Sequence, residues 1–394
     1  MLFSIYGGLL FSYLASQIFF SELERRKERT VLDSFKLETE PHVAILLPYF
    51  REDLASLCAT INSIKAQSYQ NFSLVVMNDG DPNEVTYDNL KAMYSNDHRI
   101  VFAKQVNAGK RAAQFAAAQL APEYTRYFLT IDSDTVLDVN AVNAMVCTAE
   151  ASSASAVSGA ILVKPQGDFL NKLLHSRYWL SNFQERRSQA FFNQMLCCSG
   201  PLCLWSAELF RKVGTKYIGQ TFLGSRCTYG DDRHLTNLFL EEGAIVKFAS
   251  NAKALTATPE SLSKWFKQQE RWSKSFYRES WWSLKILWNK IWGQNKANIG
   301  LYFVYANLMS FLLPFILISN IVVHLATAED VTHYAVLYLA SVFVAGWMRS
   351  IYALGFDRNW RHLLAPLYGL LHFAVFFIRI KAIFKLKDTR WGTR

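Results

Sequence analysis

Residues 127–135, which read YFLTIDSDT, decide the fold of this chain. Tyr127–Ile131 has the length and the apolar, aromatic and β-branched residues of a buried strand. Asp132 and Asp134 follow directly, one residue apart. Two carboxylates with this spacing can share a hard divalent cation, because such cations prefer oxygen ligands. A lone D-x-D pair is frequent by chance, so its meaning depends on the segments around it.

Strand-like and helix-like segments alternate on both sides of this stretch. Further strands are predicted at Val43–Leu47, Ser73–Met77 and Ile100–Ala103, and helices at Leu57–Gln67, Arg111–Ala121 and Leu235–Leu240. Such alternation implies a parallel α/β sheet, whose ligands bind beyond the carboxyl ends of the strands. The acidic stretches 78–81 (NDGD) and 132–134 fall at two such ends. For Asp79 and Gly80 a simple turn is an equal alternative.

The composition indicates a protein that is partly embedded in a membrane. Of 394 residues, 42 are Lys or Arg and 32 are Asp or Glu, which gives a net charge of +10. Charged residues make up 19% and aromatic residues 15%, which excludes a disordered or collagen-like chain. The basic residues lie at the edges of apolar runs, as the positive-inside rule expects, so we expect no nucleic-acid partner.

Three apolar runs are long enough to cross a bilayer, which takes about 20 helical residues. They cover residues 2–20, 300–325 and 331–356. Four basic residues follow the first run and place the next domain in the cytoplasm: Arg25, Arg26, Lys27 and Arg29. A span at 363–378 would leave the basic C-terminal tail outside, so an in-plane or re-entrant segment is predicted there.

These runs predict the organisation of the chain. It comprises an N-terminal transmembrane helix (1–21), a basic cytoplasmic linker (22–40), a central α/β domain (41–275), an interfacial helix rich in Trp and Lys (276–298), two transmembrane helices (299–357) and an interfacial or re-entrant segment (358–394). Plain packing is the alternative for the tryptophans of 276–298.

Three further motifs each have a chemical and a structural interpretation. Lys110 and Arg111 open a helix, which suits an anion or forms a solvated basic start. Asp231 and Asp232 precede an apolar helical run, where one carboxylate is either a general base or an N-cap. The stretch 268–272 (QQERW) offers an amide, a cation and a ring to a diphosphate and a sugar face, or is the surface of an amphipathic helix.

In combination and in this order, the motifs resemble those of the processive family 2 glycosyltransferases, membrane enzymes with a GT-A catalytic domain. They are LLPYFRED (46–53), NDGD (78–81), NAGKR (107–111), DSDT (132–135), CCSGPL (197–202), GDDRHLTN (230–237), QQERW (268–272) and WGTR (391–394). The resemblance covers nearly the whole chain. It implies that 41–275 is an α/β, Rossmann-like GT-A domain joined to transmembrane and interfacial helices.

Within that family the chain looks most like the bacterial hyaluronan synthases. GQTFLG (219–224), SKSFYRES (273–280) and WGTR carry this choice. The rhizobial chitooligosaccharide synthases are next, since they share RYWL (177–180), the CC pair and DRH, but they usually carry Glu where this chain has Asp231. The single N-terminal span, where many hyaluronan synthases have two, leaves a translocation channel incomplete unless other chains or in-plane helices complete it.

The resemblance implies a UDP-sugar donor and a catalytic metal. The donor-binding positions are Pro48, Tyr49, Glu52, Asp79, Lys110, Asp132, Arg271, Trp391 and Arg394. Asp79 is expected to accept a hydrogen bond from uracil, and Tyr49 to offer a ring for stacking. Asp134 is the expected ligand of Mg²⁺ or Mn²⁺, which would neutralise the leaving diphosphate.

Asp232 matches the family's general base, which takes the proton of the acceptor hydroxyl as its oxygen attacks the anomeric carbon. A single displacement inverts that centre, so an α-linked donor gives a β-linkage. The acceptor-binding positions are Cys198, Ser199, Gly200, Asp231, Gln268 and Trp272. The sulfur of Cys198 is expected to pack rather than react.

The implied product is hyaluronan, made from UDP-GlcNAc and UDP-glucuronic acid and passed across the cell membrane, with lipid contact and a cytoplasmic catalytic domain. Glucuronate calls for a further cation, for which the candidates are Lys164, Arg177, Arg226 and Arg233. The alternative is chitooligosaccharide synthesis from UDP-GlcNAc alone. A transporter or an inactive assembly partner is the non-enzymatic alternative, and the presence of Asp134, Asp232 and Arg271 argues against it. An oligomeric assembly is left open.

Overall fold

The computed structural model describes residues 2–327 and 331–388. Its strands are β1 (Val43–Tyr49), β2 (Phe72–Asn78), β3 (Ile100–Lys104), β4 (Tyr127–Ile131), β5 (Val136–Leu137), β6 (Ala156–Val163), β7 (Leu202–Ser206), β8 (Thr221–Phe222), β9 (Ser225–Arg226) and β10 (Val246–Thr256). The helices of the α/β part are α2 (Leu54–Lys65), α3 (Glu84–Tyr94), α4 (Lys110–Gln119), α5 (Ala141–Ser152), α6 (Phe169–Leu180), the π-helix η1 (Ser181–Arg186), α7 (Arg187–Ala190), α8 (Ala207–Ile218) and α9 (Asp231–Glu241). The remaining helices are α1 (Leu2–Ser34), α10 (Leu262–Ile291), α11 (Leu301–Ala326), α12 (Val331–Asp357), the 3₁₀ helix η2 (Trp360–Leu364) and α13 (Ala365–Phe384).

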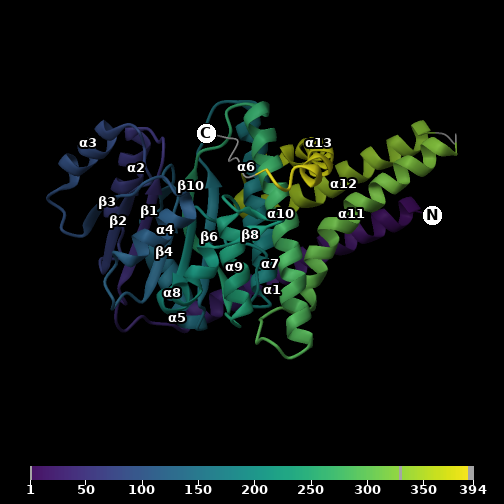
Figure 1. Cartoon of the computed structure of the whole chain (residues 1–394). Helices are drawn as coiled ribbons and strands as arrows, with labels where there is room; N and C mark the ends of the chain where they lie inside the picture. The colour runs from purple at the N-terminus through teal and green to yellow at the C-terminus, as the bar shows by residue number, and fades with distance from the viewer. Residues whose placement is uncertain (1, 328–330, 389–394) are drawn as a thin grey trace.

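Eight strands form one mixed sheet in the order β3-β2-β1-β4-β7-β6-β10-β5 (Figure 1). The first four strands are parallel, whereas β7 runs antiparallel to both β4 and β6, and β5 runs antiparallel to β10. The prediction of a parallel sheet is therefore wrong for β5 and β7. The register pairs Ile131 with Leu202, so the chain enters β7 at the edge where β4 ends. A strand entered from that edge has to run antiparallel to β4.

Helices cover both faces of the sheet, and this explains the nearly continuous apolar runs of its strands. In β1, Ile45 faces a core that includes Ile61 of α2 and Val142 of α5. Its neighbour Leu46 faces the opposite core, which includes Ala113 of α4. Successive side chains of a strand point to opposite faces, so every residue of β1 is buried.

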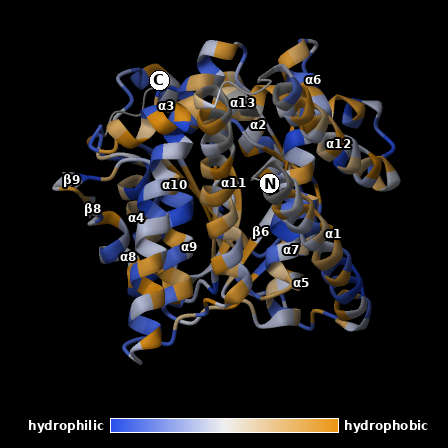
Figure 2. Cartoon of the chain, turned by 90° about the vertical axis from the view of Figure 1, so that its right-hand side faces the viewer, coloured by the Kyte–Doolittle hydropathy of each residue, from blue (hydrophilic) through white to orange (hydrophobic). Residues whose placement is uncertain are grey.

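The long helices α1, α11 and α12 project together from the α/β part, and α13 packs against α10 and α12 (Figure 1). Hydrophobic residues predominate along α11, whereas α10 carries many hydrophilic ones (Figure 2). Among the described residues, one helical segment, Val336–Asp357, is long and apolar enough to cross a membrane. Trp360–Leu371 and Ala374–Phe384 qualify together but are bent by 47° at their junction.

Two helices run across the boundaries that the sequence predicts. Helix α1 continues from the first apolar run to Ser34, and α10 begins at Leu262 and continues past residue 276. The second half of α1 is anchored in the α/β part, because Glu24 and Lys247 form a buried ion pair of 2.8 Å. The segment 22–40 is thus largely a helix docked on the sheet domain.

Candidate active site

Several of the predicted site residues converge at one edge of the sheet. Strands β2, β1 and β4 are parallel neighbours, so Asp79, Glu52 and Asp132 leave their strands at the same edge. The antiparallel strand β7 starts at this edge too, which brings the loop 197–201 beside the DSD stretch. The sheet therefore brings four separate motifs to one place.

Lys110 lies at the centre of this arrangement. Its ammonium group is 2.5 Å from Asp132 Oδ1 and 3.1 Å from Asp231 Oδ2. Burial favours the neutral amine, but the carboxylates of Asp132 and Asp231 outweigh it and raise the pKa of Lys110. Lys110 is therefore charged, and it links the D-x-D motif to helix α9.

Asp231 and Asp232 open helix α9 directly after Gly230, which adopts a left-handed conformation with φ +71°. Burial opposes ionisation of Asp231, but Lys110 and Arg111 hold its pKa below the usual range. Burial and the adjacent Asp231 raise the pKa of Asp232. Two neighbouring carboxyls with opposite shifts are typical of a site that divides acid–base roles between them. Asp232 has the stronger proton affinity, which suits a base.

The loop 197–201 is held against Asp232 by hydrogen bonds. The amide of Cys198 donates to Thr236 Oγ1 over 2.9 Å, and Thr236 Oγ1 donates to the Asp232 carbonyl over 2.7 Å. Ser199 N–H donates to Ser158 Oγ over 3.0 Å. A Cβ at Gly200 would lie 3.6 Å from Asp232 Oδ2, so the glycine borders that carboxylate. The Cys198 side chain is fully buried, in keeping with a packing role.

Asp79 organises the NAGKR loop. Its Oδ1 accepts from Gln105 Nε2 at 2.7 Å and from Ala108 N–H at 3.0 Å, and its Oδ2 accepts from Gly109 N–H at 3.0 Å. The Asn107 side chain donates to the Asp79 carbonyl over 2.9 Å. Asp79 thereby fixes the start of α4 and the position of Lys110, in addition to the contact with uracil that the sequence predicts.

Tyr49 does not present its ring at the edge of the sheet. Its side chain is 2% exposed and packs in the same core as Ile45 and Leu47. The reason is the period of two in a strand, which points alternate residues of β1 to this face. Pro48 is buried as well. The expected stacking surface of Tyr49 is therefore covered in this structure.

Two hydroxyl groups orient carboxylates in and beside the DSD stretch. Ser133 Oγ donates to Glu52 Oε2 over 2.7 Å, which fixes Glu52 above β4. Thr256 Oγ1 of β10 donates to Asp134 Oδ1 over 3.4 Å. The Asp134 side chain thus links the end of β4 to the end of β10.

Gln268, Arg271 and Trp272 lie on α10 with a spacing of three and four residues, so they share one face of the helix. The Trp272 side chain is 46% exposed. On the other side of α10, Glu270 forms ion pairs with Lys381 and Lys385 of the C-terminal segment.

The chain returns toward α9 just before its end. Tyr229 Oη donates to the carbonyl of Asp388, and Lys274 Nζ lies 3.4 Å from the same oxygen. Trp391 and Arg394, the predicted donor-binding residues of the tail, lie outside the described residues.

A buried ionic network behind α9 escaped the sequence-based prediction. Glu279, which is fully buried, accepts from Gln220 over 2.9 Å, lies 3.1 Å from His234 Nδ1 and pairs with Arg278 at 3.0 Å. Arg111 donates to Gln220 over 2.7 Å and to the Tyr229 carbonyl over 2.9 Å. In the sequence, the joint presence of GDDRH and FYRES could have indicated this network, since each motif supplies one partner of the His234–Glu279 pair.

Five arginines form a second feature, which we call the arginine cluster: Arg177 of α6, Arg186 of η1, Arg233 of α9, Arg349 of α12 and Arg379 of α13. Of these, Arg177 and Arg233 are among the four cations that the sequence offers for glucuronate, and the other three were not predicted. All five are partly buried. Arg177 and Arg349 both pair with Glu185, at 3.0 and 3.5 Å. In the described part of the chain, Glu185 is the carboxylate with which the cluster forms ion pairs.

The arginine cluster adjoins the catalytic edge. Arg186 Nε donates to the carbonyl of Cys197, and Arg233 directly follows Asp232. The guanidinium groups of Arg233 and Arg379 both lie over the ring of Phe276, at 4.6 and 5.4 Å from its centroid. The cluster therefore lies between the loop 197–201 and helices α11, α12 and α13.

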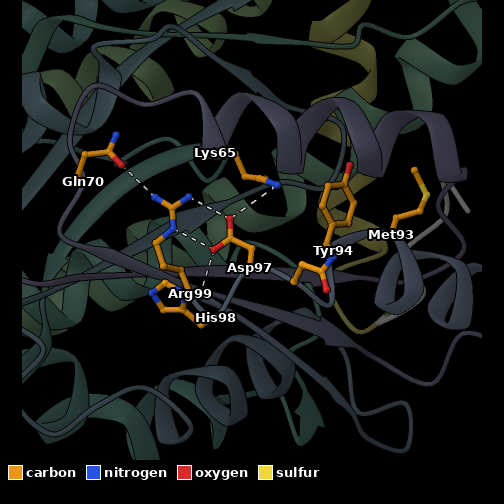
Figure 3. Close-up of a pocket in the computed structure, with 8 residues that line it drawn as sticks. Lys65, Gln70, Met93, Tyr94, Asp97, His98 and Arg99 are labelled. Atoms are coloured by element: carbon orange, nitrogen blue, oxygen red, sulfur yellow. Dashed lines mark hydrogen bonds and ion pairs between the residues drawn. The ribbon is translucent and has the colours of Figure 1, made fainter.

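A separate open pocket lies far from this site, at the turn between α3 and β3 (Figure 3). Asp97 there pairs with Arg99 at 3.0 Å and with Lys65 at 3.7 Å, and Arg99 also donates to Gln70 Oε1. These opposite charges neutralise one another across the turn. None of the predicted site residues lines this pocket.

Comparisons with known proteins identify the family of this chain. Residues 44–214 match the model of the family described as "Glycosyl transferase family 2". The chain is 31% identical over 401 residues to a hyaluronan synthase of Streptococcus pyogenes, covering 99% of this chain and 90% of that protein. It is 28% identical over 367 residues to an N-acetylglucosaminyltransferase of Azorhizobium caulinodans, covering 92% and 90%.

Two further similarities extend the comparison. The chain is 28% identical over 432 residues to hyaluronan synthase 2 of Gallus gallus, covering 99% of this chain and 76% of that protein. Among solved structures, a mannosyltransferase of Pyrobaculum calidifontis, in complex with GDP-Man and Mn²⁺, has a TM-score of 0.61 at 14% identity over 99% of this chain and the whole of that one. At this identity the likeness concerns the fold alone.

Proposed function

The chain belongs to glycosyltransferase family 2 and has a GT-A fold, and from this premise we propose that it is a processive hyaluronan synthase of the cell membrane. It would polymerise a β-linked polysaccharide from UDP-GlcNAc and UDP-glucuronic acid. The observation that carries this choice of product is the arginine cluster, in which two of the five arginines, Arg177 and Arg349, share the single carboxylate of Glu185.

The donor would bind along the edge formed by β1, β2 and β4. Lys110 supplies a buried positive charge there, and Arg271 on α10 offers a planar fork that suits a diphosphate. Asp132 and Asp134 both follow β4, and their carboxylate oxygens suit a hard divalent cation rather than a soft one. Asp134 would hold Mg²⁺ or Mn²⁺, which when bound neutralises the charge of the diphosphate.

Asp232 would act as the general base. One of its oxygens, Oδ1, accepts from Arg233 N–H at 2.8 Å, while Oδ2 faces Gly200 and the loop of the acceptor side. The carboxylate takes the proton of the acceptor hydroxyl while that oxygen bonds to the anomeric carbon and the bond to the UDP oxygen breaks. One displacement inverts the anomeric centre, so no covalent enzyme intermediate is required. Asp231 stays ionised and holds Lys110 in place.

The arginine cluster suits an anionic product. Arg177 and Arg349 pair with Glu185, whereas no ion pair is formed by Arg186, Arg233 or Arg379 within the described residues. A partly buried guanidinium group without an ion pair is costly, because it loses hydration. Burial lowers the pKa of Arg233, although Cys197, Glu279 and Asp232 oppose the shift. A polymer with a carboxylate on every second sugar would supply the missing negative charge as it leaves the site. A neutral chitin chain would not.

The apolar helices would place the enzyme in the membrane with its α/β domain in the cytoplasm. The segment Val336–Asp357 and the bent pair from Trp360 to Phe384 support this placement by length and composition. Trp281 and Trp288 of α10 and Trp292, its C-cap, are exposed, as is typical of tryptophans at a membrane surface. The polymer would pass between these helices during synthesis.

The second candidate is synthesis of chitooligosaccharides from UDP-GlcNAc alone. The 28% identity to the N-acetylglucosaminyltransferase of Azorhizobium caulinodans favours it. Both candidates use the same base, metal ligand and donor edge, so they differ only in the sugars accepted.

Neutralising one member of the arginine cluster tests the proposal. Arg379→Gln should shorten the polymer, because the leaving chain loses one of its cations, whereas the KM for each donor should stay near that of the unmodified enzyme, because the cluster lies outside the donor edge. Arg26→Gln, which removes an exposed charge from α1, is the matched control. Equal polymer length in the two variants would remove the support for an anionic product.

A further inference from the structure

Two histidines and an aspartate meet where the catalytic domain contacts the end of α12. His175 comes from α6, Asp357 is the last residue of α12, and His362 lies in η2. One ligand atom from each lies within 4.8 Å of the others. The cluster lies outside the catalytic edge, and none of the motifs from the sequence includes these residues.

The separations between the three ligand atoms are close to those between the ligands of a bound transition metal. The Asp357 Oδ2 atom is 2.7 Å from His362 Nε2 and 3.6 Å from His175 Nε2. Two ligands that each lie about 2.0 Å from a tetrahedral Zn²⁺ ion are about 3.3 Å apart. The observed separations fall on either side of this value, and all three ligand atoms lie within 4.8 Å of one another.

The surroundings of His362 and His175 favour ligation. His362 is fully buried and the His175 side chain is 14% exposed, and burial favours the neutral imidazole that binds metals. His362 Nδ1 lies 3.3 Å from Ser176 Oγ, an outer contact of the kind that orients a metal-binding imidazole. The same residues could instead form a metal-free network, because Asn359 Nδ2 lies 3.2 Å from His175 Nε2.

We propose that His175, Asp357 and His362 form a binding site for a divalent transition metal such as Zn²⁺. Two imidazoles and one carboxylate select such a metal over Mg²⁺, which prefers oxygen ligands alone. The site joins α6 of the catalytic domain to the end of α12 and to η2, so a bound ion would fasten the membrane-proximal helices to the α/β domain. This proposal does not depend on the sugars that the enzyme uses.

The backbone at this junction is shaped to bring the ligands together. Arg358, between Asp357 and Asn359, has a positive φ of 52°, which is uncommon for a residue with a side chain. Asn359 then caps η2, because its Oδ1 accepts from Arg361 N–H over 3.1 Å. The resulting sharp turn places His362 opposite Asp357.

The test measures metal binding by the full-length protein, purified in detergent with a tag that contains no histidine. After treatment with a chelator and dialysis, Zn²⁺ is added, and bound metal is quantified by elemental analysis and by calorimetric titration. Substitution with Co²⁺ adds a visible spectrum that reports ligation by nitrogen and oxygen. We expect one tightly bound Zn²⁺ per chain, and at least tenfold weaker binding in His175→Gln and Asp357→Asn.

Two controls keep the result specific. His98→Gln removes an exposed histidine from the distant α3–β3 turn, and Asp134→Ala removes the predicted ligand of the catalytic metal; both should keep the Zn²⁺. Zn²⁺ should also raise the melting temperature of the unmodified protein but not that of His175→Gln, which distinguishes lost ligation from lost folding. Equal Zn²⁺ binding by the unmodified protein and His175→Gln, or no binding by either, would overturn the proposal.

Discussion

The ammonium group of Lys110 lies 2.5 Å from the carboxylate of Asp132, so the NAGKR and DSD motifs are joined by a buried ion pair. The same ammonium group reaches Asp231 at 3.1 Å. A single lysine therefore connects the donor edge to the helix that carries the proposed base. Its charge acts on both aspartates of α9, and several predictions depend on this arrangement.

Asp232→Asn should abolish turnover and leave UDP binding largely unchanged. The amide keeps the size of the side chain but cannot accept the acceptor's proton, so we expect a rate loss of about 10²- to 10⁴-fold. Release of UDP during polymer synthesis measures turnover, and calorimetry measures UDP binding. Asp33→Asn, at an exposed position of α1, is the control. Near-normal turnover in Asp232→Asn would refute its role as base.

The pH dependence of kcat/KM should reflect the environment of Asp232. The base must be ionised, so activity should rise with pH through its pKa, which burial and Asp231 hold above the usual value of an aspartate. Asp231→Asn removes the repelling charge and should move the acid limb of the profile to lower pH. A shift to higher pH in Asp231→Asn would contradict this account of the pair.

Gly200→Ala should fold normally but lower activity. The added Cβ would lie 3.5 Å from Lys110 Nζ and 3.6 Å from Asp232 Oδ2, which is ordinary contact, yet it would occupy the space in front of the base. We expect turnover to fall by about 10- to 100-fold at an unchanged melting temperature. A melting temperature that falls together with the activity would instead indicate a packing role for Gly200.

Gly230→Ala, unlike Gly200→Ala, should lower the stability of the protein. Its φ is +71°, and an added Cβ would lie 2.0 Å from Ser275 Oγ. We expect the free energy of unfolding to fall by about 1–3 kcal/mol from the backbone strain alone, so thermal unfolding should occur at a lower temperature. An unchanged melting temperature in Gly230→Ala would contradict the close packing of α9 against α10.

Glu279→Gln should destabilise the protein, because it leaves Arg278 without its buried partner. The expected loss is about 3–5 kcal/mol in the free energy of unfolding. Burial opposes ionisation of Glu279, but His234, Arg278 and Gln220 hold its pKa far below the usual value. Its stabilising contribution is therefore complete above the pKa of an unfolded glutamate, about 4.3, and declines as the pH falls below it.

Melting curves of Glu279→Gln and the unmodified protein across pH check this prediction. The difference between them should be largest near neutral pH and should shrink in acid. Glu260→Gln, which alters an exposed helix pair, should change little at any pH. A difference that grows in acid would contradict the assigned direction of the pKa shift.

The sequence allowed the family and the general fold to be predicted, because local patterns carry that information. Tyr127–Ile131 was placed as a strand with the bounds that the structure shows, and the acidic residues after it lie at the edge where α/β sheets bind ligands. The matches to glycosyltransferase family 2 and to hyaluronan synthases confirm the resemblance that the motifs indicated.

The remaining features depend on contacts between distant segments. Nothing local reveals that β7 runs antiparallel to β4, although this direction brings the loop 197–201 to Asp132. The burial of Tyr49 follows from the helices that cover its face of the sheet. The partner of Glu279 is His234, 45 residues away, and such a pairing is defined only by the packing of α10 against α9.

The most direct test of the central claim is polymer synthesis in isolated membranes with Mg²⁺ or Mn²⁺. UDP-GlcNAc alone is compared with UDP-GlcNAc plus UDP-glucuronic acid, and the product is digested with hyaluronidase or with chitinase. We predict polymer only when both donors are present, and its complete digestion by hyaluronidase. Polymer from UDP-GlcNAc alone that is digested by chitinase would contradict the proposed product.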